Sequence, residues 1–74
     1  MDPGGLDDVI MACNNDGMCF QADGTGPAPE KMPYSFYRCM HYGAVWVIVC
    51  YVASTKKIFM CSKINDTWSG WVEK

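Results

Sequence analysis

Residues 44–53 read Ala-Val-Trp-Val-Ile-Val-Cys-Tyr-Val-Ala, ten residues without a charge or a turn former. β-Branched and aromatic side chains at this density are typical of a strand. Both alternating sets of side chains are apolar, with Val47 and Val49 in one set and Ile48 and Cys50 in the other. Such a strand is expected at the centre of a sheet, with both of its faces covered.

The flanking segments supply the partners of this strand. Residues 34–41 have strand composition, and Tyr42-Gly43 offers a two-residue turn into the central strand. On its other side, the polar turn at 54–57 leads into a strand at 58–64. These turns predict a register with the following facing pairs: Cys39 and Trp46, Tyr37 and Ile48, Ser35 and Cys50, Tyr51 and Met60, Cys50 and Cys61.

The N-terminal segment predicts an amphipathic helix. Four apolar residues recur at the spacing of one helical stripe: Leu6, Val9, Ile10 and Cys13. Asp2 followed by Pro3 is a candidate N-cap with proline at the first helical position. The sequence Asn-Asn-Asp-Gly at 14–17 contains residues that accept a left-handed backbone, so the helix is expected to end there.

Three shorter segments complete the chain. Residues 18–22 predict a short edge strand, and residues 23–33, with two glycines and three prolines, predict a flexible loop. Residues 65–72 predict a turn and a short terminal strand or helical turn that folds back over the sheet. The expected fold is α+β, with an N-terminal helix packed on a three- or four-stranded antiparallel meander, and residues 1–74 form a single small domain.

Side-chain alternation divides the predicted sheet into two faces. One is aliphatic and aromatic, interrupted only by Arg38 and Ser62, and we expect the helix to cover it. The other contains three cysteines and the only histidine, and no helix is left to cover it. Either the loop and the tail with Trp68 and Trp71 cover it as ordinary core, or another molecule does, and in the second case it is the working side. Its members are Ser35, Tyr37, Cys39, His41, Trp46, Ile48, Cys50, Val52, Phe59 and Cys61.

Composition narrows the class of protein. Half of the 74 residues are apolar and 19% are charged, which favours a folded globule over a disordered chain. Residues 1–30 contain six acids and no Lys or Arg, whereas residues 31–74 contain six Lys and Arg against two acids. This division allows an acidic layer to lie against a basic one inside the fold, or an acidic face to bind a basic partner.

The sequence also bears on location. Its start lacks the basic region and the long apolar run of a signal peptide, and ten apolar residues are too few to cross a bilayer as a helix. We therefore expect a cytoplasmic protein with no membrane contact, whose five cysteines are thiols. A disulfide between Cys50 and Cys61 is the alternative that the predicted register leaves open.

The function expected from this architecture is a small non-enzymatic protein-binding module that acts by steric blocking, and no cofactor is expected. Aromatic side chains would fill pockets on another protein, or on a second copy in a homodimer. The candidate anchors are Tyr37, Trp46, Phe59, Trp68 and Trp71. The size, the acidic N-terminal half and the Trp and Met content resemble in style the small phage and mobile-element proteins that inhibit a larger host complex, such as anti-CRISPR proteins.

The alternative is a small zinc- or thiol-based domain that uses the cysteine-rich face through Cys39, His41, Cys50 and Cys61. The spacing argues against it, because no Cys-x-x-Cys pair occurs in the chain. Cysteine catalysis is not expected, because an apolar sheet disfavours the thiolate. Nucleic acid is an unlikely partner for a chain with a pI of about 5.0.

Overall fold

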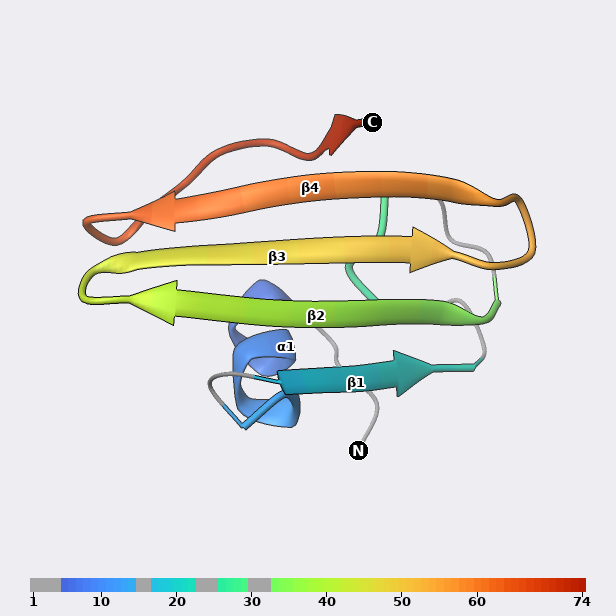
Figure 1. Cartoon of the computed structure of the whole chain (residues 1–74), viewed down its shortest axis with the longest axis horizontal. Coiled ribbons are helices and arrows are strands. Elements are labelled where there is room, and N and C mark those ends of the chain that lie inside the picture. Colours follow the sequence, from blue (N-terminus) through green and yellow to red (C-terminus); the bar gives the residue numbers. More distant parts are fainter. Residues whose placement is uncertain (1–4, 15–16, 23–25, 30–32) are drawn as a thin grey trace.

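A computed structural model describes residues 5–14, 17–22, 26–29 and 33–74. Within these ranges the chain forms one helix and six strands (Figure 1). In chain order they are α1 (Leu6–Ala12), β1 (Gly17–Gln21), β2 (Ser35–Tyr42), β3 (Val45–Val52), β4 (Lys57–Ile64), β5 (Thr67–Trp68) and β6 (Val72–Glu73). The α+β prediction is confirmed, and the sheet is larger than expected because the C-terminal tail adds two short strands.

The strands form one antiparallel sheet in the order β1-β2-β3-β4-β5, and β6 also pairs with β4. This is the predicted meander, with β3 at the centre and β1 at an edge (Figure 1). The other edge is β4, along which the tail runs. Ser69 donates its backbone N–H to the Ser62 carbonyl at 2.8 Å, and Lys74 donates its N–H to the Ile58 carbonyl at 2.8 Å.

The predicted registers are wrong by two residues. The turn from β2 to β3 consists of Gly43 and Ala44, not Tyr42 and Gly43, and Tyr42 pairs with Val45. Gly43 has φ +60°, so glycine occupies the first turn position, as a type II′ turn requires, while Tyr42 keeps an extended backbone. The next loop spans residues 53–56, with Lys56 at φ +60°.

A register shift of two residues changes which residues face each other across the strands. It leaves each side chain on the same face of the sheet, because side chains alternate with a period of two. Cys50 therefore faces Phe59, and Cys61 faces Ile48. The expected opposition of Cys50 and Cys61 does not exist, and all five cysteines are free thiols. The division of the sheet into two faces survives the correction.

The helical stripe is confirmed. Val9, Ile10 and Cys13 are buried, and Leu6 packs against them. The helix starts after an extended Gly5, and Asn14 takes the left-handed conformation just beyond Cys13, with φ +56°. The predicted Asp2-Pro3 cap lies outside the described residues.

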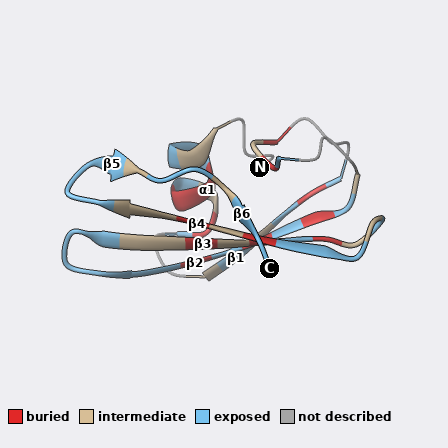
Figure 2. Ribbon diagram, turned by 90° about the horizontal axis from the view of Figure 1, so that it is seen from above, coloured by how far each residue is buried: buried red, intermediate tan, exposed pale blue. Residues whose placement is uncertain are grey.

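The expectation about which face the helix covers is wrong. Figure 2 shows the sheet edge-on, with α1 and β5 on one side of it. The buried residues of the sheet belong to the cysteine-rich set: Ser35, Tyr37, Cys39, Ile48, Cys50, Val52, Phe59 and Cys61. The reason is volume, because cysteine and serine side chains leave room for a helix to approach the strands closely. The larger side chains of the other face would hold it away.

Segments distant in sequence complete this core. Ala28, from the predicted flexible loop, is buried and donates its backbone N–H to the Tyr37 hydroxyl at 3.1 Å. Residues 23–25 and 30–32 of that loop lie outside the described residues. Trp71 donates its indole N–H to the Pro27 carbonyl at 2.9 Å, so the tail does fold back as predicted.

Candidate protein-binding face

The sheet surface opposite α1 is here called the bare face. Cross-strand pairing arranges its side chains in four rows. The rows are Phe20-Phe36-Tyr51-Ile58, Met18-Arg38-Val49-Met60-Val72, Met40-Val47-Ser62 and Tyr42-Val45-Ile64-Thr67. Thirteen of these sixteen side chains are apolar or aromatic, so the bare face is the most apolar surface that the described residues form.

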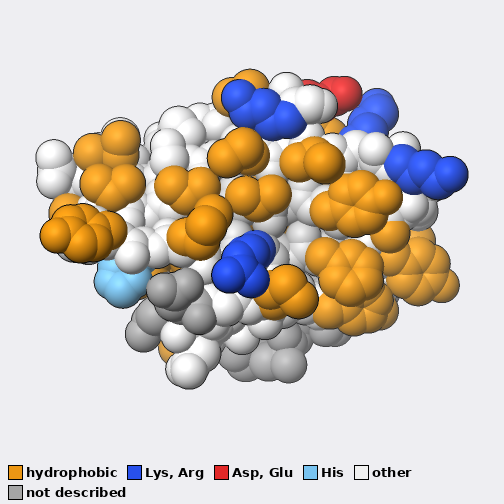
Figure 3. Space-filling view, in the orientation of Figure 1, with side chains coloured by type: hydrophobic (Ala, Val, Ile, Leu, Met, Phe, Trp, Pro, Cys, Tyr) orange, Lys and Arg blue, Asp and Glu red, His pale blue; other side chains and the backbone are white. Residues whose placement is uncertain are grey.

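Many of these side chains are exposed, including Met18, Phe36, Val45 and Ile64. Figure 3 views this side of the molecule and shows hydrophobic side chains spread from one end of the sheet to the other. Contiguous exposed apolar patches above a few hundred Å² are rare on monomeric soluble proteins and mark interaction sites. The bare face is therefore the strongest candidate for a binding surface.

An aromatic cluster occupies one end of the bare face. The rings of Phe20 and Phe36 lie 4.7 Å apart, centroid to centroid, in a tilted arrangement. Tyr34 stacks on Phe20 at 6.4 Å, and Tyr51 pairs with Phe36 across the strands. Rings that already pack against each other are pre-ordered, so little side-chain entropy is lost when a partner covers them.

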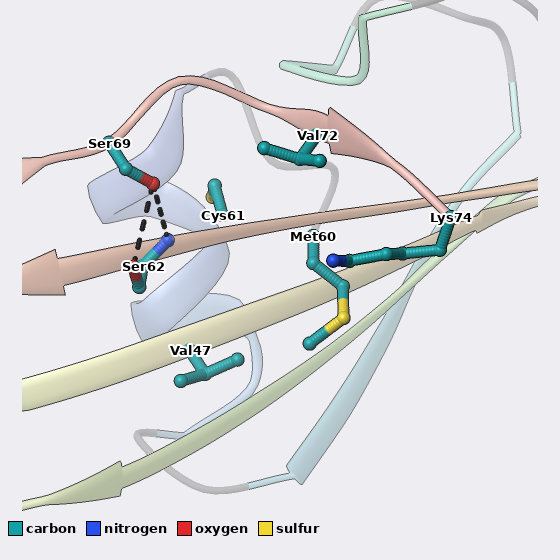
Figure 4. Close-up of a pocket in the computed structure, with 7 residues that line it drawn as sticks. All are labelled: Val47, Met60, Cys61, Ser62, Ser69, Val72 and Lys74. Atoms are coloured by element: carbon teal, nitrogen blue, oxygen red, sulfur yellow. Dashed lines mark hydrogen bonds between the residues drawn. The ribbon is translucent and has the colours of Figure 1, made fainter.

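Two hollows indent the bare face on either side of Val47. One has a volume of about 270 Å³ and is lined by Val47, Met60, Cys61, Ser62, Ser69, Val72 and Lys74. Figure 4 shows Lys74 extending toward Met60, while the Ser69 hydroxyl accepts the Ser62 N–H at 3.0 Å and holds the tail against β4. The second, of about 240 Å³, is lined by Met40, His41, Tyr42, Val45 and Val47.

The charge on the bare face is positive and sparse. Arg38 is the only charged side chain that the described parts of β1, β2, β3 and β4 place there, and Lys74 lies at its margin. Asp7 and Asp8 belong to α1, on the opposite side of the sheet. In Figure 3 acidic atoms show only at the margin. A partner therefore meets an apolar surface with one central cation.

The structure places the five predicted anchors on the covered side. Tyr37 and Phe59 are only 1% and 5% exposed. Trp46, Trp68 and Trp71 are partly buried and pack against the same core. The expected working side is thus the interior of the protein. Sequence reasoning placed most residues of the bare face on the side that the helix was expected to cover. It left out Tyr42, Thr67 and Val72, and also Met18 and Phe20, whose alternation in the short edge strand was the available signal.

The structure does not bring together the residues of the predicted zinc or thiol site. Cys39, Cys50 and Cys61 are buried, whereas His41 is exposed and stacks on Trp46 with ring centroids 4.1 Å apart. Among the described residues, no group of three or more His, Cys, Asp or Glu side chains is placed to hold a metal ion.

Burial also keeps the thiols protonated. It raises the pKa of Cys50 to about 11 and that of Cys61 to about 12. Burial together with the adjacent Cys13 thiol raises the pKa of Cys19 to about 12. Metal ligation and nucleophilic attack both need the thiolate, so these cysteines suit a core and not a reactive site.

Comparison of the chain with known protein families, curated proteins and solved structures finds no match. Among the described residues, no helix is long and apolar enough to cross a membrane. Inference about function therefore rests on the surface itself.

Proposed function

We propose that this chain is a non-enzymatic protein-binding module that acts sterically through the bare face. One observation carries the proposal: four strands present a continuous apolar surface on the side that α1 leaves open. The sequence suggested the same class of function, but with the opposite face as the working side.

The chemistry of the bare face favours protein over nucleic acid. Single-stranded nucleic acids are bound by aromatic platforms combined with a groove of several cations. Here the ring cluster lies at one end and Tyr42 alone at the other, aliphatic side chains such as Val45 and Ile64 lie between or beside them, and Arg38 is the only charge that the described strands place at the centre. Aliphatic surface gains most from burial against another apolar surface, at about 25 cal/mol per Å².

The proposal extends to steric inhibition of a larger complex. The small phage-type inhibitors that this chain resembles in size and composition act in this way. An apolar sheet face can block a surface without any chemistry of its own. The small size and the acidic N-terminal half support this extension. The buried thiols and the separated His41 give no support to the zinc- or thiol-based alternative.

The test is capture of proteins from the native host by the immobilised chain, compared across matched variants. Val47→Lys places a charge at the centre of the bare face, between its two hollows. Met11→Lys places the same charge on α1, where Met11 is 68% exposed. Circular dichroism checks the fold of both variants.

We expect wild type and Met11→Lys to capture the same proteins, whether host proteins or further copies of this chain, and Val47→Lys to lose them by at least about tenfold, because a buried unpaired charge is costly. Capture that survives Val47→Lys, or that Met11→Lys abolishes equally, contradicts the proposal. Quantitative mass spectrometry provides the measurement.

A further inference from the structure

We propose that the occupant of the bare face is a second copy of this chain, packed sheet on sheet as a two-fold β-sandwich dimer. This inference rests on the proposed function and names its partner. Three observations support it: the size of the bare face, its composition, and the pairing of the C-terminal tail along the β4 edge.

The size matches a stable interface. The molecule measures 33 × 25 × 16 Å, and the sheet spans the two longer dimensions, so the bare face has a footprint of at most about 800 Å². A standard protein interface buries about 800 Å² on each partner. One further copy is therefore enough to cover the bare face almost completely.

The composition is that of a permanently covered surface. Homodimer interfaces are more apolar than transient ones, and transient interfaces carry polar and charged groups in amounts close to the general surface. Of the described residues on the bare face, only Arg38, Ser62 and Thr67 depart from apolar or aromatic character. A chain this short also buries only about 60% of its unfolded surface by itself, so a second copy adds the apolar burial that one short helix does not provide.

The geometry favours stacking over edge-to-edge pairing at β4. The tail already occupies that edge, through the pairing of β5 and β6 with β4 and the bonds between Ser62 and Ser69. Stacked sheets lie about 10 Å apart with interdigitated side chains. The two hollows beside Val47 give the projecting side chains of a partner copy, such as Tyr51, a place to enter.

Arg38 distinguishes a second copy from a partner that presents an acidic group. It lies in β2, one strand from the β1 edge, about 5 Å away, so its guanidinium can reach solvent past Met18. None of the described residues on the bare face is acidic, so the described part of that face on a second copy offers Arg38 no carboxylate. Replacing Arg38 by an apolar residue should therefore strengthen self-association, whereas it should weaken binding to a partner that presents an acid.

The experiment is sedimentation equilibrium of the full chain over a concentration series, with four proteins: wild type, Val47→Lys, Met11→Lys and Arg38→Met. We expect a wild-type dimer at micromolar concentration and unchanged behaviour in Met11→Lys. Val47→Lys should raise the dissociation constant at least about 100-fold, and Arg38→Met should lower it about three- to tenfold. All three tryptophans pack on the covered side, so their emission should stay constant as folded dimers dissociate.

A second measurement does not depend on the folding of the lysine variant. Replacing Tyr51, which is on the bare face, by p-benzoylphenylalanine should give a light-dependent covalent dimer, and the same replacement at Met11 should not. Equal cross-linking at the two positions contradicts the inference.

A wild-type chain that remains monomeric at millimolar concentration overturns the second-copy inference. A dimer that Arg38→Met weakens overturns the proposed packing, in which Arg38 meets no carboxylate. A monomer whose capture of host proteins is still abolished by Val47→Lys leaves the protein-binding proposal standing. A monomer whose capture is insensitive to Val47→Lys overturns both proposals.

Discussion

The two faces of the sheet are built from the same strands and are both rich in apolar residues, yet one is a core and the other a surface. α1 contacts β1 and β2, where the covered face has the small side chains of Cys19 and Cys39, and it lies close enough to bury Val9 completely. On the same two strands the bare face has larger side chains, including Met18, Phe20 and Phe36. The difference teaches that room for a helix, and not apolar content, decides which face becomes the core.

High pH should cause the largest change, and it acts through the covered face. The pKa of Cys61 is raised from 9.0 to about 12 and that of Cys50 to about 11, because burial disfavours the thiolate, and the pKa of Tyr37 is raised to about 12. The unfolded chain loses these thiol protons near pH 9 while the folded protein keeps them. Their contribution to stability is therefore complete below pH 9 and is lost as the pH rises through 11 to 12.

Unfolding in urea can be monitored by tryptophan emission. We expect the urea concentration at the midpoint to be constant up to about pH 8.5 and to fall to zero by about pH 12. Cys61→Ala lowers the absolute stability but removes one titrating group. Its free energy of unfolding should fall less steeply with pH between 9 and 12 than that of wild type. An identical slope would show that the buried thiols do not couple to folding.

The second prediction compares the same substitution on the two faces. Ile48 on the covered face is fully buried, whereas Ile58 on the bare face is 41% exposed. Ile48→Ala should lower the free energy of unfolding by about 3 to 4 kcal/mol, because it removes core methyl groups and leaves a cavity. Ile58→Ala should cost about 1 kcal/mol or less.

Both variants should be measured in the Val47→Lys background, in which the bare face stays uncovered. Chemical denaturation at one protein concentration gives the two values. Equal costs for Ile48→Ala and Ile58→Ala would mean that the division into a core face and a bare face is wrong. In the dimer-competent background, the cost of Ile58→Ala should increase with protein concentration.

The third prediction concerns hydroxyl groups of tyrosine. Tyr37→Phe removes the acceptor of the Ala28 N–H bond inside the core and leaves that buried donor unsatisfied, at a cost of about 1 to 2 kcal/mol. Tyr42 is 90% exposed, so Tyr42→Phe should change stability by less than about 0.5 kcal/mol. Thermal unfolding of the two variants measures the difference, and a Tyr42→Phe cost as large as that of Tyr37→Phe would count against it.

Much of the fold could be predicted from local pattern. Periodicity identified α1 and the long strands, and the central position of β3 followed from apolar side chains on both of its sides. The registers failed because they depend on which residue of a turn takes positive φ. Gly43 does so at the first turn position, which moves every pair in β2 and β3 by two residues.

The candidate site could not be predicted, because the choice of covered face is a tertiary property. Alternation correctly separated Ile48 and Cys50 from Val47 and Val49. It contained no information on which set meets the helix, since both sets are apolar. The deciding contacts come from segments far apart in the chain, such as Ala28 on Tyr37 and Trp71 on Pro27. We infer that packing volume, summed over these segments, selects the face.

The prediction with the smallest expected effect tests whether charge helps to determine which face of the sheet α1 covers. Lys63 in β4 bonds Asp7 of α1 at 3.3 Å, but the Asp7 side chain is 75% exposed. The Lys63 ammonium also lies 5.5 Å from the Trp68 ring and 4.0 Å from Asp66, so it keeps other interactions when Asp7 is neutral. Asp7→Asn should therefore cost only about 0.5 kcal/mol or less.

Asp8→Asn is the matched control, because Asp8 also lies in the first turn of α1 and favours the helix dipole in the same way. The difference between the two variants isolates the Lys63 pair, and it should disappear in 1 M salt, where exposed charges are screened within about 3 Å. Urea unfolding at low and high salt gives that difference. An excess cost above about 1 kcal/mol for Asp7→Asn would mean that an ion pair, and not packing volume alone, directs α1 to the cysteine-rich face.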